Sequence, residues 1–117
     1  MNQARRNHSS CSLGDYIYVC CGEDNNDSFN SFERLNVVSF LGGTQDTSWE
    51  PLQIEENELL TPRSNCSMAA FGSNKIIVFG GDNAQLGGLQ AEGCIVEFTK
   101  YNRRVSKRFD AREFRHT

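Results

Sequence analysis

The chain has 117 residues, 38% of them hydrophobic, and a formal net charge of −3 at pH 7. This length suits one globular unit and excludes two full-sized domains. No run reaches the roughly 18 apolar residues that a membrane span needs, and the polar amino terminus lacks the apolar core of a secretory signal. We therefore expect a cytoplasmic protein without a membrane partner.

The five cysteines are an odd number, and two of them, Cys20 and Cys21, are adjacent. Neither feature resembles a disulfide framework or a CxxC zinc site, so we expect reduced thiols and no metal ion. Residues 100–117 hold seven Lys and Arg against two acidic residues. Because apolar residues alternate with them, a strand with one solvated face explains them as well as a nucleic-acid surface does. We do not expect nucleic acid as the partner.

Two short apolar runs that end in glycine are the strongest structural signals in the chain. The first covers residues 16–22 and the second covers residues 75–81. Both are too short for a typical helix and are rich in β-branched and aromatic residues, so they predict strands. Their apolar character is continuous, which predicts burial on both faces.

Each run follows a similar segment: an arginine, then small residues, then a turn that contains glycine. This segment covers residues 6–15 in the first unit and residues 63–74 in the second. Asp15 and Asn74 occupy matching turn positions just before the apolar runs. Each unit is therefore predicted to begin with a β-hairpin.

Two further strands are predicted in each unit. In the first unit a polar loop is expected at 23–31, the third strand at 32–38 and the fourth strand at 48–54. In the second unit the corresponding segments are 82–93, 94–98 and 104–109. Gly22 and Gly81 stand 59 positions apart, and a four-stranded repeat of roughly 50 residues is typical of a propeller blade. We predict an all-β fold of about eight strands, in two four-stranded antiparallel sheets without a substantial helix.

The order of these features resembles the kelch repeat. The residues that carry the resemblance are Arg6, Tyr18 to Gly22, Glu33 and Trp49 in the first unit, and Arg63, Ile77 to Gly81 and Glu97 in the second. Two departures stand out: Cys21 replaces the first glycine of the pair, and the second unit has no tryptophan, Phe109 being the nearest aromatic residue. Together the two units cover residues from about 5 to 110.

The resemblance implies a partial β-propeller of two consecutive blades. Blade 1 is expected at 5–60, a degenerate blade 2 at 61–113, and the opening of a further blade at 114–117. Structural roles are expected for Gly22, Gly80, Gly81, Glu33, Glu97 and Trp49, the last packed between blades. Repeat units need neighbours to bury their faces. We therefore expect a larger array, or self-association through open faces that carry Tyr18, Val78 and Phe98.

In proteins similar to this one, partner proteins dock on loops between the second and third strands and on the crossings between blades. Carried over, the partner-binding residues are Arg6, Arg63, Asn65, Asp24, Asn25, Asp82 and Asn83. For both arginines, a structural role in hydrogen bonding is an equally good interpretation. The function expected is a protein-binding scaffold, such as a substrate adaptor or a cytoskeletal contact.

Two other functions stay open. One is an enzyme similar to galactose oxidase, whose copper would need ligands such as Tyr16, Tyr18 and Tyr101, although no suitable second histidine lies near them. The other is a divergent remnant without activity of its own. The glycine-rich stretch 80–88 lacks the lysine and the following helix of a phosphate-binding loop. We expect no catalytic residue and no cofactor.

Overall fold

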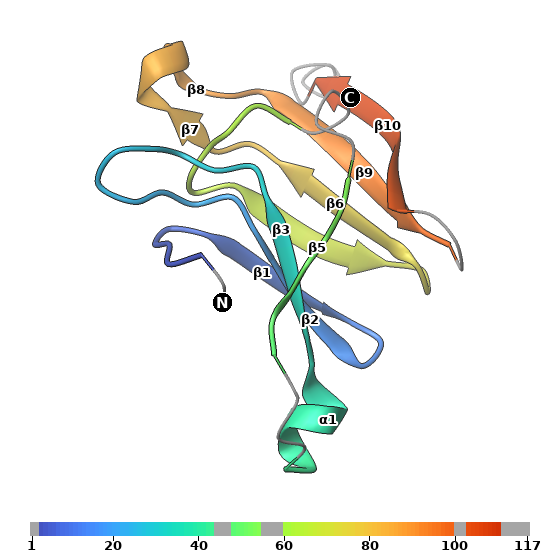
Figure 1. Ribbon diagram of the computed structural model, residues 1–117. Helices are drawn as coiled ribbons and strands as arrows, with labels where there is room; N and C mark the ends of the chain where they lie inside the picture. The colour runs from blue at the N-terminus through green and yellow to red at the C-terminus, as the bar shows by residue number, and fades with distance from the viewer. Residues whose placement is uncertain (1–2, 44–47, 55–59, 100–102, 111–117) are drawn as a thin grey trace.

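The computed structural model describes residues 3–43, 48–54, 60–99 and 103–110. Over these residues the chain forms two four-stranded antiparallel sheets and one small two-stranded sheet (Figure 1). The first sheet has the strand order β1-β2-β3-β4, and the second has the order β5-β6-β9-β10. Within each large sheet the strands follow one another in chain order, as in a propeller blade. The predicted all-β fold is confirmed.

The strands of the first sheet are β1 (Ser9–Leu13), β2 (Tyr16–Cys20), β3 (Phe32–Asn36) and β4 (Glu50–Pro51). Those of the second sheet are β5 (Ser67–Phe71), β6 (Lys75–Phe79), β9 (Glu92–Phe98) and β10 (Arg103–Asp110). The two predicted hairpins are present as β1–β2 and β5–β6. The long strand β10 keeps its pairing with β9 through a register shift between Val105 and Lys107.

One short helix, α1 (Val37–Leu41), directly follows β3, so the third strand ends at Asn36 and not at residue 38. The Asn36 side chain accepts a hydrogen bond from the backbone N–H of Ser39, which caps the helix. Gly42 N in turn donates to Val38 O at the other end. A capping asparagine therefore overrides the strand preference of the two valines.

Two other segments also differ from the prediction. Of the described residues in the predicted fourth strand, Glu50 and Pro51 pair with β3, and Leu52 N donates a further hydrogen bond to Phe32 O. The segment 82–93 is not a plain loop, because it contains β7 (Asp82–Asn83), η1 (Ala84–Leu86) and β8 (Gly88–Leu89). The Asn83 side chain caps η1 by accepting a hydrogen bond from Gln85 N.

The hydrophobic core lies between the two large sheets. Tyr18 and Cys20 of β2 pack there with Ile76 and Val78 of β6. The rings of Tyr18 and Phe98 meet across the interface, with their centroids 5.1 Å apart. The expectation that Tyr18, Val78 and Phe98 lie on open sheet faces is therefore wrong. These residues join the two sheets instead.

The face that the first sheet buries in this interface does not correspond to the face that the second sheet buries. When Gly22 is aligned with Gly81, the β2 residues Tyr16, Tyr18 and Cys20 correspond to the β6 residues Lys75, Ile77 and Phe79. The β2 residues face the second sheet, whereas the β6 residues face away from the first, and Phe79 is 38% exposed. The prediction that β6 is buried on both faces is thus wrong. The sheets pack head to tail, and the second sheet leaves uncovered the face that the first one buries.

The predicted blade boundaries, 5–60 and 61–113, stay a prediction. The expected opening of a further blade at 114–117 lies outside the described residues. Within the described part of the chain, no helix is both long and apolar enough to cross a lipid bilayer.

Candidate partner-binding face

Arg63, predicted to bind a partner, has a fully buried side chain. Its guanidinium donates to the carbonyl oxygens of Gly80 and Glu92, at 3.0 and 3.1 Å. It also donates to the backbone oxygen and the hydroxyl of Thr61. Since Gly80 N donates to Glu92 O as well, Arg63 holds the end of β6 against the start of β9. In this structure Arg63 has a structural role.

Arg5, and not Arg6, occupies the same place in the first unit. Its guanidinium donates to the carbonyl oxygens of Cys21 and Ser31, at 2.8 and 3.0 Å. Cys21 N donates to Ser31 O, which repeats the pattern around Arg63. The assignment of Arg6 as the motif arginine is wrong by one position, because the sequence does not show which of two adjacent arginines points inward.

A buried ion pair links this arginine to β3. Arg5 Nη2 donates to Glu33 Oε2 at 2.9 Å, and both side chains are buried. In the register of the second sheet, the residue that corresponds to Glu33 is Cys94 and not Glu97. Glu97 lies further along β9, opposite Lys75. The structural role predicted for Glu33 thus has a physical basis, but its pairing with Glu97 is wrong.

We call the glycines that close the two apolar runs, Gly22 and Gly81, the glycine ends. Each allows the backbone to lie close to another segment of the chain. Gly81 has φ +92, and a Cβ atom there would lie only 2.6 Å from Ser64 O. Gly22 has φ +97 and is similarly crowded. The preceding positions, Gly80 and Cys21, have φ values of 73 and 63. Cys21 therefore keeps the left-handed turn that a glycine would favour.

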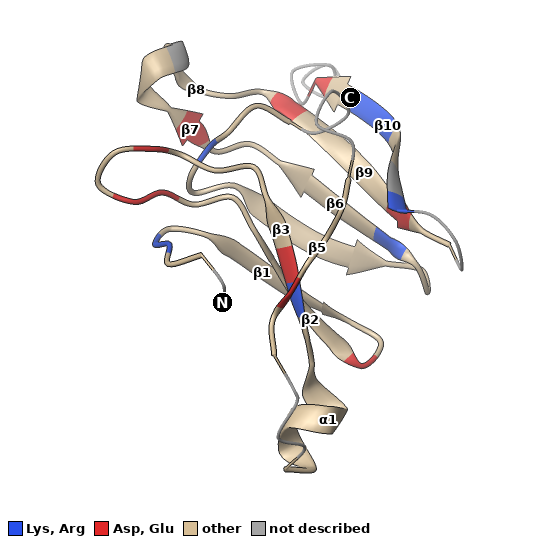
Figure 2. Cartoon of the chain, viewed as in Figure 1, with Lys and Arg blue, Asp and Glu red and all other residues tan. Residues whose placement is uncertain are grey.

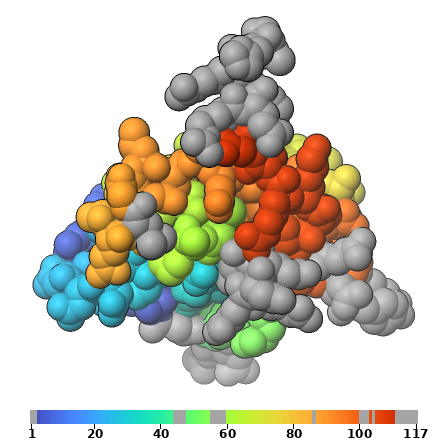
Figure 3. All heavy atoms as spheres, turned by 90° about the horizontal axis from the view of Figure 1, so that it is seen from above, coloured from blue at the N-terminus to red at the C-terminus, as the bar shows by residue number. Residues whose placement is uncertain are grey.

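Five predicted partner-binding residues line one hollow of about 250 Å³: Arg6, Asp24, Asn25, Asp82 and Asn83. The hollow lies where the loop after β2 meets β7 and η1, which Figure 3 shows as neighbouring cyan and orange surfaces. A second hollow of about 270 Å³ shares four of the lining residues, Arg6, Glu23, Asp24 and Asn25. We call these two hollows and their lining residues the loop face.

The loop face is acidic. Four acidic residues, Glu23, Asp24, Asp27 and Asp82, stand against Arg6 around the first hollow. Figure 2 shows acidic segments in the loop after β2 and on β7, at the same end of the molecule. The backbone N–H groups of Asp27 and Asn26 donate to Asp24 Oδ1, and they lower the pKa of its carboxyl group. The Asp24 carboxylate is therefore held in its charged form.

Backbone hydrogen bonds fix the two parts of the loop face. Arg6 and Glu23 exchange two backbone hydrogen bonds, and Ser64 and Asp82 do the same in the second unit. The Asn65 side chain, which is exposed, donates to Asp82 Oδ2 at 3.4 Å. Asn65 thus lies at the border of the loop face. Of the seven predicted partner-binding residues, Arg63 and Asn83 are buried, and Arg63 does not line either hollow.

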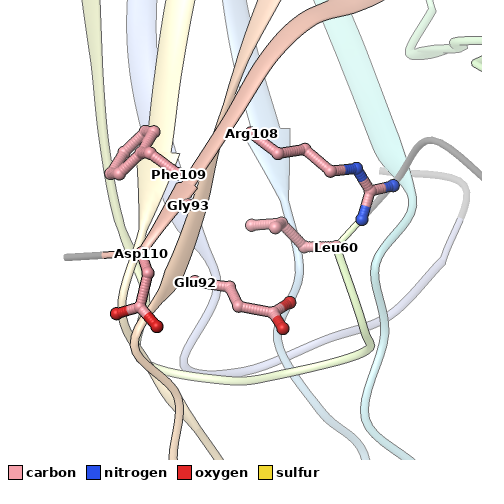
Figure 4. Close-up of a pocket in the computed structure, with 6 residues that line it drawn as sticks. All are labelled: Leu60, Glu92, Gly93, Arg108, Phe109 and Asp110. Carbon is pink, nitrogen blue, oxygen red and sulfur yellow. The ribbon is translucent and has the colours of Figure 1, made fainter. Parts of the chain in front are cut away.

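A separate hollow of about 290 Å³ lies beside β9 and β10 (Figure 4). Its lining residues are Leu60, Glu92, Gly93, Arg108, Phe109 and Asp110. The Phe109 ring lies over Gly93, where a Cβ atom would meet ring carbons at 2.3 to 2.9 Å. The charged groups around this hollow carry both signs, so it does not favour one charge as the loop face does.

Trp49 lies directly before β4 and is half-buried. Leu52 and Ile54 of the same segment are buried in the core between the sheets. The packing of Trp49 between blades stays a prediction.

The kelch motif family matches residues 4–40 of the chain. The match contains Arg5 and the strands β1, β2 and β3. No curated protein matches the chain. The second sheet repeats the buried arginine, the glycine end and the strand order of the first. Residues 4–40 therefore match a kelch motif, and the second sheet repeats the main features of that unit.

Proposed function

We propose that this chain is a protein-interaction module, and not an enzyme, that binds a partner protein through the loop face. The observation that carries the proposal is the convergence of loops from both units on one hollow. Loops held on a rigid scaffold are the usual place for recognition. Kelch repeats generally mediate contacts between proteins, which supports the same assignment.

The charge of the loop face suggests the chemistry of the partner. Four carboxylates against one guanidinium favour an exposed segment rich in Lys and Arg. Asn25 and Asn65 add neutral donors and acceptors at the rim. Such a surface fits either a substrate adaptor or a cytoskeletal contact.

The test is a binding titration with a fluorescent Arg- and Lys-rich peptide, followed by anisotropy. Asp24→Asn and Asp82→Asn should each weaken binding by about 2–5-fold, as expected for exposed ion pairs. Asp15→Asn is the matched control, because exposed Asp15 lies in the β1–β2 turn at the other end of β2. Affinity that is independent of salt, or equal for all three variants, would contradict the proposal.

A second surface is proposed for contact with another copy of the chain. The uncovered face of the second sheet carries Ile77, Phe71 and Phe79, the last two 41% and 38% exposed. This face corresponds to the face of the first sheet that is buried against the second sheet. We propose that the outer face of the first sheet of a second copy docks there, continuing the head-to-tail packing.

Sedimentation velocity over a range of concentrations tests this contact. The chain should self-associate, and Phe79→Lys should shift it towards the monomer. Phe40→Lys is the control, because Phe40 on α1 is exposed but lies away from the uncovered sheet face. A monomer at all concentrations, without binding of a hydrophobic dye, would refute the contact and leave the proposal for the loop face intact.

The described tyrosines do not support the alternative of a copper enzyme. The guanidinium of Arg34 lies over the Tyr16 ring at 4.1 Å from its centroid, and the Tyr18 ring is buried against Phe98. Tyr101 lies outside the described residues. All five cysteines are free, which suits a reducing compartment, so we keep the cytoplasm as the proposed location.

A further inference from the structure

Three cysteines that are separated in the sequence meet in the core. Cys20 ends β2, Cys21 follows it, and Cys66 directly precedes β5. Their Sγ atoms all lie within 4.8 Å of one another. Cys20 is 0%, Cys21 2% and Cys66 9% exposed. Because the cluster joins both sheets, it forms only when the two sheets are packed together.

Further donor groups surround the three thiols. Met68 Sδ lies 3.8 Å from Cys20 Sγ, which places a fourth sulfur at the edge of the cluster. Ser9 Oγ lies 3.0 Å from Cys66 Sγ and donates to the Cys66 carbonyl oxygen. The surroundings are therefore rich in sulfur, with one hydroxyl that fixes the position of Cys66.

The positive charge of Arg63 acts on the Cys66 thiol. Arg63 is a fully buried positive charge. It offsets part of the negative charge that bound thiolates would place in the core.

The backbone gives independent support for a role of these thiols. Cys21 has φ 63, a conformation that disfavours a side chain, whereas its counterpart Gly80 has φ 73 and no side chain. Glycine would therefore satisfy the backbone at both positions. A strained residue that brings a thiol into a cluster points to a use for that thiol.

We propose that Cys20, Cys21 and Cys66 form a binding site for Cu(I). Soft thiolate and thioether ligands select Cu(I), and every donor described above except the Ser9 hydroxyl is sulfur. Structural zinc sites almost always take four Cys or His ligands, whereas the described residues bring three such side chains together.

Binding is a ligand exchange without a redox step. Cu(I) leaves its carrier ligand, each sulfur–copper bond replaces a sulfur–hydrogen bond, and the released protons go to solvent. The copper stays monovalent and the sulfurs stay reduced. The spacing of the cysteines could not predict this site, because Cys66 comes from the other unit.

The test is a competition, without oxygen, between the full reduced chain and a chromophoric Cu(I) chelator, after all five thiols have been counted. The chain should take one Cu(I), and X-ray absorption should show sulfur as the only ligand type. Cys66→Ser and Cys21→Ser should each weaken Cu(I) binding by about 100-fold or more. The same titration with Zn(II) should show clearly weaker binding.

Two control variants separate this site from general thiol chemistry. Cys94→Ser removes a buried thiol outside the cluster, and Cys11→Ser removes a half-buried one; both should bind Cu(I) like the unchanged chain. Circular dichroism and unfolding of each copper-free variant establish that it is folded. Unchanged binding in folded Cys66→Ser, or preferential binding of Zn(II), would overturn the proposal.

Discussion

Replacing Gly81 by alanine is expected to destabilise the fold by about 2–5 kcal/mol, the sum of two costs. Gly81 has φ +92, in a region that costs a residue with a Cβ about 1–2 kcal/mol. The new Cβ would also lie 2.6 Å from Ser64 O and 3.1 Å from Cys66 N. Overpacking of this kind costs about 1–3 kcal/mol. Because Ser64 exchanges two backbone hydrogen bonds with Asp82, it cannot move aside freely.

A substitution at the neighbouring Gly80 separates the cost of the positive φ from the cost of the close contact. Gly80 has φ +73, but no atom lies within 4 Å of its hypothetical Cβ, and Cys21 already has this conformation in the first unit. Gly80→Ala should therefore cost only about 1–2 kcal/mol. Urea unfolding followed by Trp49 fluorescence measures both values, provided that the m-value is unchanged. Equal destabilisation by the two substitutions would refute the reasoning about the close contact.

Three further predictions concern stability and use the same unfolding assay. Gly93→Ala should cost about 1–3 kcal/mol, since its Cβ would overlap the Phe109 ring; a neutral effect would mean that the ring moves away at no cost. Arg5→Met should cost about 3–5 kcal/mol, because it removes the guanidinium that lies against the buried Glu33 carboxylate, and adding Glu33→Leu should recover most of this loss. Arg6→Met should change stability by less than about 0.5 kcal/mol, as expected for an exposed side chain. The reverse order for the two arginines would restore Arg6 as the structural residue.

The hairpins, the strand order and the glycine ends could be predicted from the sequence, because they depend on local signals. Apolar runs that end in glycine have the same meaning wherever they occur, as β2 and β6 show. The choice between Arg5 and Arg6 has no such signal, since it depends on which side chain reaches the carbonyl of Ser31. The exposure of Phe79 also depends on which face the neighbouring sheet covers.

The candidate site also combines features that local sequence signals predict with features that depend on packing between the sheets. The loops that line the acidic hollow could be predicted, because each follows directly after a glycine end. The burial of Arg63 and the meeting of Cys66 with Cys20 could not be predicted, since both depend on how the second unit packs on the first. The helix α1 was hidden for a local reason: the valines after Asn36 favour a strand, and the asparagine cap outweighs them.

The packing of β2 against the second sheet also has a consequence for the synthesis of the chain. The first sheet is complete up to β3 once Asn36 has been synthesised. The strands that pack against it, β5 and β6, are complete only after Phe79 has been synthesised. At about 5–20 residues per second, ribosomes need about 2–9 s for the intervening segment. During this interval Tyr18 and the thiols of Cys20 and Cys21 have no second sheet against them. The nascent chain, more than the finished protein, is therefore the form exposed to oxidants and to chaperones.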